Sequence, residues 1–134
     1  LQNETDFFTA TEKKNILHFA PEQEFYKRFK KQKNIQYTTT DLFSPLADVK
    51  ADICNLPFED NQYDVLFCNH VLDHIPDDTK AMQELYRVCA DGAIIQVAVP
   101  HPRHDTFLMD PTHRRPIYPH TLRMFSRKRN MEQI

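Results

Sequence analysis

The sequence predicts an α/β fold in which a mainly parallel sheet lies between helices. Short apolar runs alternate with amphipathic stretches along residues 15–100, the pattern of repeated strand–helix–strand units. One run, Tyr63–Cys68, is almost continuously apolar, as expected of a central parallel strand that is covered on both faces. The chain of 134 residues is short enough to form a single domain, 1–134.

Each element has its own signal in the residue pattern. In the first helix, Phe25 and Phe29 fall on one face and lysines on the other. Asp77 and Asp78 precede the second helix, where negative charge complements the helix dipole. Gly92 marks a turn into the last strand. The pattern predicts a polar lead-in over 1–14, strands over 16–19, 35–40, 51–54, 63–68 and 93–99, helices over 22–33, 79–88 and 119–126, and a long loop over 101–119.

The turn after the first strand lacks glycine. In nucleotide-binding strand–helix–strand units a glycine-rich turn lets the backbone approach the ligand, but here the turn reads Ala20-Pro21-Glu22. Asp41 closes the second strand about 20 residues later, and a carboxylate there can accept both hydroxyl hydrogens of a ribose. The alternative is that Asp41 is a solvated or capping loop acid. The layout predicts a nucleoside cofactor held without the usual glycines.

Composition excludes several classes of protein. No apolar run approaches the ~18–20 residues of a membrane span, and no signal peptide precedes the first strand. The three cysteines are too few and too irregular for a disulfide framework, which favours a reduced cytoplasmic protein. Residues 101–134 carry 7 Lys and Arg against 3 Asp and Glu. This basic tail can meet an anionic substrate or be a solvated helix end, and nucleic acid is the weaker interpretation.

The acids at the strand ends and the run after them resemble a known family. Asp41, Asp52-Ile53 and the stretch Leu56–Val88 are similar to class I S-adenosylmethionine-dependent methyltransferases, and more narrowly to the bacterial methyltransferase type 11 branch. The similarity covers about residues 14–100, and 56–88 is its most specific part. It implies a Rossmann-like three-layer sandwich, S-adenosyl-L-methionine as cofactor and methyl transfer as the activity.

The resemblance also implies roles for individual residues. In the family the acid of strand two holds the ribose, the acid of strand three and its neighbour hold adenine, and the end of strand four lies near methionine and substrate. On the residues alone, Asp52 can instead cap the turn that follows it. The resulting candidates for cofactor binding are His18, Ala20, Glu22, Asp41, Leu42, Asp52, Ile53 and Asn69.

Strand one departs from the family pattern. His18 stands where the family has an acid, and Ala20 and Glu22 stand where it has glycines. S-adenosylmethionine carries no phosphate, so the helix start need not hold an anion. Its amino group is cationic and can pair with Glu22. Alternatively, Glu22 only stabilises the start of the helix.

Histidines are the candidates for a general base, because imidazole titrates near neutral pH. The catalytic candidates are His70, His101 and His104, and the segment 101–134 is expected to border the acceptor. If the acceptor needs no deprotonation, these histidines have no role as a general base. His74 is expected to cap or pack after strand four. The residues in 101–113 have types that suit a metal, but their spacing matches no metal motif, so no metal is expected.

The favoured function is methyl transfer to a small molecule or glycan, without a membrane partner. The alternative is a catalytically inactive, methyltransferase-like binding or scaffold module, which the altered turn supports. The antiparallel hairpin that usually ends the family's sheet is missing or barely begun at 131–134. Without it one edge of the sheet is open, which favours a homodimer.

Overall fold

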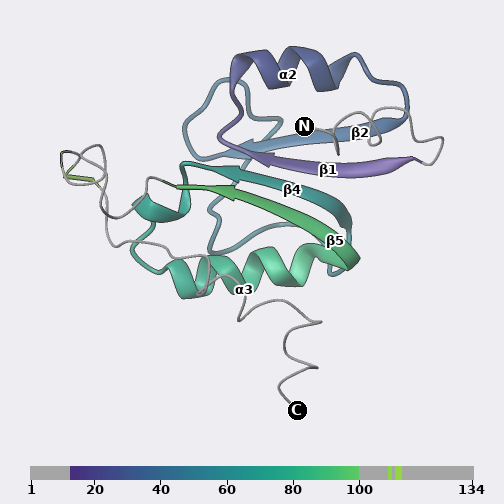
Figure 1. The fold of residues 1–134 in the computed structure, drawn as a ribbon. Coiled ribbons are helices and arrows are strands. Elements are labelled where there is room, and N and C mark those ends of the chain that lie inside the picture. The colour runs from purple at the N-terminus through teal and green to yellow at the C-terminus, as the bar shows by residue number, and fades with distance from the viewer. Residues whose placement is uncertain (1–12, 100–108, 110, 113–134) are drawn as a thin grey trace.

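The computed structural model describes residues 13–99, 109 and 111–112 (Figure 1). These residues form one five-stranded sheet in the order β3-β2-β1-β4-β5, and every strand pair is parallel. The elements are β1 (Lys14–Phe19), α2 (Gln23–Lys30), β2 (Ile35–Asp41), β3 (Val49–Lys50), β4 (Tyr63–Asn69), the 3-10 helix η1 (Leu72–His74), α3 (Asp78–Val88) and β5 (Cys89–Ala98). The predicted Rossmann-like, mainly parallel α/β sandwich is confirmed.

Helices cover the two faces of the sheet separately, with α2 on one side and α3 on the other (Figure 1). The alternation of β1 explains this division. Ile16 joins the aromatic cluster under α2, whereas Leu17 and Phe19 join the larger core under α3. Both clusters extend onto β4, where Val65 and Leu66 face opposite sides. The central strands are therefore apolar on both faces because both faces are buried.

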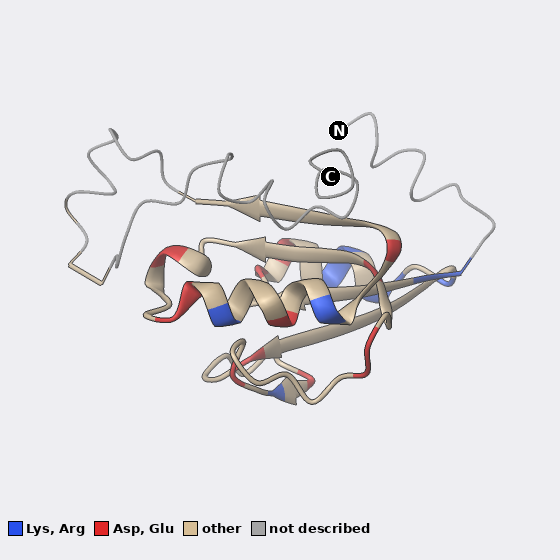
Figure 2. Cartoon of the chain, turned by 90° about the horizontal axis from the view of Figure 1, so that it is seen from below, with Lys and Arg blue, Asp and Glu red and all other residues tan. Residues whose placement is uncertain are grey.

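The helix α3 begins and ends as its sequence predicts. The carboxylate of Asp77 accepts a hydrogen bond from the backbone N–H of Lys80 (3.1 Å), which caps the first turn. Acidic and basic residues alternate along the helix, from Asp78 through Lys80 and Glu84 to Arg87 (Figure 2). The apolar face of the helix is buried in the core. The strand β5 follows directly after Val88.

The third strand lies earlier than predicted. The pattern places it over 51–54, but β3 covers only Val49–Lys50. Two buried threonines of β2 fix this position: Thr39 donates to the Leu46 carbonyl (2.6 Å) and Thr40 to that of Val49 (2.8 Å). The chain then turns away at Asp52, so the prediction of 51–54 was wrong because side-chain bonds to the previous strand decide the pairing.

The last strand and the first helix also differ in their bounds. Gly92 does not end a turn before the strand but lies inside β5, at φ 75°, where the register with β4 shifts between Tyr63 and Val65. An extra stretch of backbone is absorbed there as a bulge, which glycine favours. The helix α2 ends at Lys30, short of the predicted Lys33.

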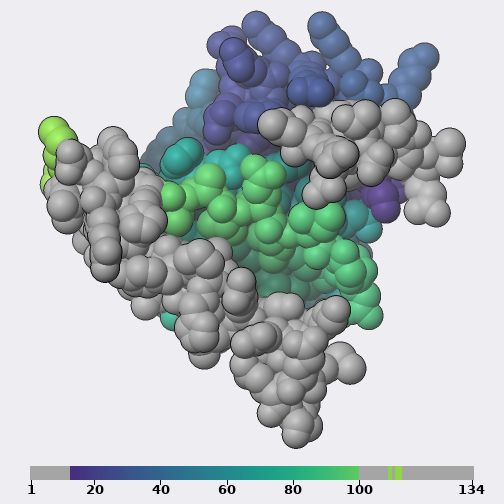
Figure 3. Space-filling view, viewed as in Figure 1, coloured from purple at the N-terminus to yellow at the C-terminus, as the bar shows by residue number. Residues whose placement is uncertain are grey.

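The outer strand β5 lies at the surface of the described residues (Figure 3). Ile94 and Ile95 are 60% and 39% exposed. Within the described residues β5 pairs only with β4, so its outer edge is open there. No helix that the structure describes is both long and apolar enough to cross a membrane.

Candidate functional site

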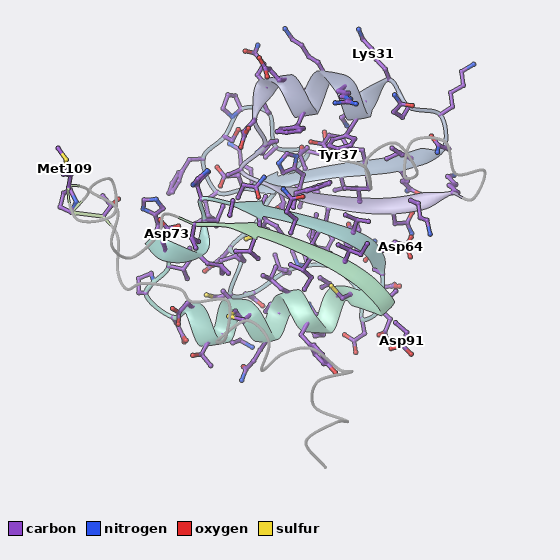
Figure 4. The ribbon with its side chains drawn as sticks, viewed as in Figure 1. Lys31, Tyr37, Asp64, Asp73, Asp91 and Met109 are labelled. Carbon is purple, nitrogen blue, oxygen red and sulfur yellow. The ribbon has the colours of Figure 1, made fainter. Side chains whose placement is uncertain are left out.

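The carboxyl ends of the strands bring the predicted residues to one edge of the sheet. The strand order reverses between β1 and β4, and in open α/β sheets ligands bind at this switch point. Two backbone hydrogen bonds tie the edge together: Ala20 N–H donates to the Thr40 carbonyl (3.0 Å), and His70 N–H donates to that of Ala98 (2.6 Å). Asp64 and Asp91 lie at the opposite edge (Figure 4).

The turns that leave β1 and β4 have the same unusual backbone. Ala20 has φ 46° and His70 has φ 58°, both in the left-handed region. Each residue follows directly after its strand, and the two strands are neighbours. The first turn therefore keeps the conformation that glycine normally supplies, although alanine stands there, at a cost of about 1 kcal/mol.

Substitutions at Ala20 test this backbone conformation. We expect Ala20→Val to unfold about 2 kcal/mol more easily than Ala20→Gly, because a β-branched side chain tolerates the left-handed region poorly and glycine favours it. The same pair at Ala47, which has no positive φ, serves as the control and should not favour glycine. Urea denaturation measures all four variants. Equal stability of the two Ala20 variants would contradict a left-handed turn.

Asp41 ends β2, as predicted, and it organises the turn that follows. Its Oδ2 accepts hydrogen bonds from the backbone N–H groups of Phe43 (3.1 Å) and Ser44 (2.7 Å). This is the capping role that the sequence left open. One carboxylate oxygen carries both bonds, so Oδ1 is the oxygen through which Asp41 can bind a ribose. Leu42 and Phe43 are 47% and 87% exposed beside it.

Asp52 and Ile53 follow β3 with different surroundings. Asp52 is exposed, and its Oδ1 accepts a hydrogen bond from Cys54 N–H (2.9 Å). Ile53 is only 6% exposed and packs into the core under α3. The Ile53 side chain thus has little free surface for an adenine ring.

His18 is enclosed between the sheet and α2. It is 1% exposed, its ring lies against those of Phe25 and Phe67, and its Nδ1 lies 2.6 Å from the hydroxyl of Tyr37, which sits in the same layer (Figure 4). Burial lowers the pKa of His18 to about 4 and raises that of Tyr37. The imidazole is therefore neutral at physiological pH, and its Nδ1 shares one hydrogen bond with the Tyr37 hydroxyl.

Unsatisfied polar atoms mark the switch point. Among the side chains that the structure describes, His18 Nε2 and Asn69 Oδ1 are buried without a hydrogen-bond partner. His18 is the penultimate residue of β1, and Asn69 is the last residue of the neighbouring strand β4. Such atoms cost about 1–3 kcal/mol unless water or a ligand satisfies them. Glu22 is exposed at the start of α2 nearby. An acceptor oxygen and an acid at this edge fit the cationic amino group of a bound amino acid moiety.

Only one of the three candidate bases lies within the residues that the structure describes. His70 is exposed directly after β4, while His101 and His104 lie outside the described residues. His74 has a contact that the sequence pattern did not reveal: its Nδ1 lies 2.8 Å from Thr112 Oγ1. The two residues are 38 positions apart, and no local spacing predicts such a contact.

The described residues show neither a metal site nor a disulfide. No group of three or more His, Cys, Asp or Glu side chains within them is placed to hold a metal ion. Cys54, Cys68 and Cys89 are free thiols. Cys68 is fully buried in the core, and burial raises its pKa to about 12, so it acts as a small apolar residue.

The amino-acid sequence is similar to known methyltransferase sequences. The methyltransferase domain family matches residues 6–97, which is more than half of the chain. The 2-phytyl-1,4-naphtoquinone methyltransferase of Nostoc punctiforme is 44% identical over 48 residues, which are 36% of this chain and 21% of that protein. The chain thus spans about a fifth of the length of this relative.

Solved structures share the fold at low sequence identity. A SAM dependent methyltransferase from Archaeoglobus fulgidus superposes with a TM-score of 0.74 and 20% identity, over 93% of this chain and 63% of that one. The cyclase SpnF gives a TM-score of 0.70 and 18% identity, over 95% of this chain and 55% of that one. At such identities the likeness establishes the fold alone. Together with the family match, the sheet order and the strand-end acids, it shows that the chain belongs to the methyltransferase domain family, within the class I S-adenosylmethionine-dependent methyltransferases.

Proposed function

We propose that this chain binds S-adenosylmethionine at the carboxyl edge of the sheet and transfers its methyl group to a small molecule or glycan. One observation carries the proposal. Asp41 ends β2 and Asp52 follows β3, the two neighbouring strands that lie on the β1 side of the switch point between β1 and β4. Two acids at neighbouring strand ends suit the ribose hydroxyls and the adenine amino group, each of which offers hydrogens to an acceptor.

The chain's own residues divide the work of binding. Asp41 accepts hydrogen bonds from the ribose hydroxyls through Oδ1. Asp52 accepts one from the adenine amino group through the carboxylate oxygen that does not bond Cys54. Glu22 and Asn69 Oδ1 are the acceptors for the amino group, so they orient the amino acid part toward β4. When bound, the cofactor supplies an electrophilic methyl group. The protein contributes mainly position, because a methyl group held in line with its acceptor reacts without further activation.

The acceptor enters on the side of η1 and the carboxyl end of β5. His70 is exposed there, and the basic segment 101–134 follows in the sequence. Positive charge in that segment supports an anionic small molecule or glycan rather than an apolar one. We place the protein in the cytoplasm, since its three cysteines are free thiols.

Calorimetry with S-adenosylhomocysteine, the demethylated product, tests the cofactor site. We expect the wild type to bind and Asp41→Asn to bind at least roughly tenfold more weakly, because the amide oxygen keeps the two bonds to the turn and an NH2 donor replaces the acceptor Oδ1 that faces the ribose. Asparagine still caps Phe43 and Ser44, so the turn should persist. The control is Asp91→Asn at the opposite edge, which should bind as the wild type does (Figure 4).

The same experiment decides between enzyme and scaffold. Two observations favour the scaffold. Asp41 already accepts hydrogen bonds from the turn that follows it, and the Ile53 side chain is buried, so both have less capacity to bind a cofactor. A wild type that does not bind the product at millimolar concentration, while it remains folded, would overturn the enzymatic proposal. Equal binding by Asp41→Asn and the wild type would leave binding intact but remove Asp41 from the site.

A further inference from the structure

Three polar side chains form a continuous chain beyond the end of β4. The hydroxyl Oγ1 of Thr112 lies 2.8 Å from His74 Nδ1, and His74 Nε2 lies 3.7 Å from Asp73 Oδ2. Asp73 and His74 belong to η1, at the edge of the sheet that carries Asn69 and His70, and Figure 4 shows Asp73 at that edge. The contact joins segments 38 residues apart, so it is a tertiary arrangement rather than a local turn.

The three groups differ in their access to solvent. The Asp73 side chain is 1% exposed, that of His74 is 36% exposed, and Thr112 is exposed. A buried carboxylate therefore stands behind the imidazole, and an accessible hydroxyl stands in front of it. Burial of a carboxylate costs free energy, and other interactions in the fold have to offset this cost. The imidazole beside Asp73 is one group that can contribute to the offset.

The carboxylate lies too far from Nε2 for a hydrogen bond, but its charge favours one tautomer of His74. An anion near Nε2 favours the proton on that nitrogen, because the N–H dipole then points at the negative charge. Nδ1 is then left with its lone pair, and it accepts the hydrogen bond that Thr112 donates. The order of groups is that of a carboxylate, an oriented imidazole and a hydroxyl, in which the imidazole can take a proton from the hydroxyl.

We propose that Thr112 and His74 form a proton relay that deprotonates a hydroxyl-bearing acceptor during methyl transfer, with Asp73 as the positioning residue. This inference rests on the proposed function and names the acceptor class as a hydroxyl compound. The acceptor hydroxyl gives its proton to Thr112 Oγ1 while Thr112 passes its own proton to His74 Nδ1. The acceptor oxygen forms a bond to the methyl carbon as the methyl–sulfur bond breaks, and the electron pair of that bond stays on sulfur. The imidazolium then releases the proton to solvent.

The geometry is tested by nitrogen-detected magnetic resonance of the histidine rings. We expect His74 to carry its proton on Nε2 in the wild type and in Thr112→Ser. Asp73→Asn should shift the population toward the other tautomer, because the carboxylate that favours Nε2–H is gone. A wild type with the proton on Nδ1, or an Asp73→Asn variant with an unchanged spectrum, would overturn the relay. Neither observation requires activity.

The chemistry is tested with catechol and 4-nitrocatechol as methyl acceptors, with labelled S-adenosylmethionine. At a pH where only the nitro compound is ionised, the wild type and Thr112→Ser should label both. Thr112→Val keeps the shape of the side chain but lacks the hydroxyl, and His74→Gln lacks the imidazole. Both variants should label catechol roughly tenfold or more slowly than the wild type does. Both should label 4-nitrocatechol at the wild-type rate. Labelling of catechol by Thr112→Val at the wild-type rate would overturn the relay.

Calorimetry separates failure of the relay from failure of the proposed function. Thr112→Val and His74→Gln should bind S-adenosylhomocysteine as the wild type does, because neither residue is placed on the cofactor. If the wild type binds the cofactor product but labels neither catechol, the assignment of a hydroxyl acceptor is wrong. If the wild type does not bind it at all, the proposed function fails first, and the relay with it.

Discussion

Replacement of Arg87 by alanine is expected to lower the free energy of unfolding by about 3 kcal/mol. The guanidinium donates to the carbonyls of Phe58 (2.7 Å) and Leu56 (3.0 Å) and to the carboxylates of Glu84 (2.9 Å) and Asp60 (2.8 Å). It thereby fastens the loop before β4 to α3. Without it, Glu84, which is 7% exposed, keeps a buried negative charge with only the Leu56 N–H and the more distant Lys80 ammonium near it.

Lys80 provides the matched control, because it lies 3.9 Å from the same Glu84 carboxylate but is 49% exposed. Lys80→Ala should cost about 0.5 kcal/mol or less, as exposed ion pairs usually do. The hydrogen bonds of Arg87 hold the pKa of Glu84 below its usual value, so the Arg87 effect should shrink in acid as Glu84 takes a proton. Urea denaturation measures both variants. A loss below about 1 kcal/mol in Arg87→Ala would show that this loop does not depend on the guanidinium.

Acidification from about pH 6.5 to about pH 4 is expected to remove about 3 kcal/mol of stability through His18 alone. Burial lowers the folded-state pKa of His18 to about 4, below the ordinary value of 6.5. Between these two values the unfolded chain binds a proton that the folded chain does not. Stability therefore rises with pH across this window, is complete above it, and is lost as the pH falls.

Chemical denaturation at a series of pH values measures the slope, and two variants assign it. His18→Gln should lose most of the dependence in this window, whatever its absolute stability, because the titrating group is gone. His70→Gln should keep it, because His70 is exposed. If His18→Gln shows the same pH dependence as the wild type, the imidazole is not buried in the neutral form.

Periodicity predicted most of the fold because the central elements are decided by burial. The bounds of β1, β2, β4 and α3 agree with the sequence pattern to within two residues. β3 and the start of β5 were displaced because side-chain bonds from Thr39 and Thr40 and the bulge at Gly92 set them. Neither feature produces a hydrophobic periodicity that could be recognised in the sequence. Such local irregularities are read only from the three-dimensional pairing.

The site was predictable in position but not in detail. Asp41 and Asn69 were expected at strand ends, and they lie there. The left-handed Ala20 could not be foreseen, because alanine rarely adopts this conformation. The burial of Ile53 and the contact of His74 with Thr112 depend on segments distant in sequence. The roles of His101 and His104 stay predictions, since both lie outside the described residues.

A crystal structure of the protein grown with S-adenosylhomocysteine tests the central claim most directly. We expect density for the adenosine at the carboxyl edge, with the ribose hydroxyls on Asp41 Oδ1 and the base beside Asp52. The amino group should lie near Glu22 and Asn69 Oδ1. Adenosine bound elsewhere, or at this edge without contact to either acid, would contradict the proposed cofactor site.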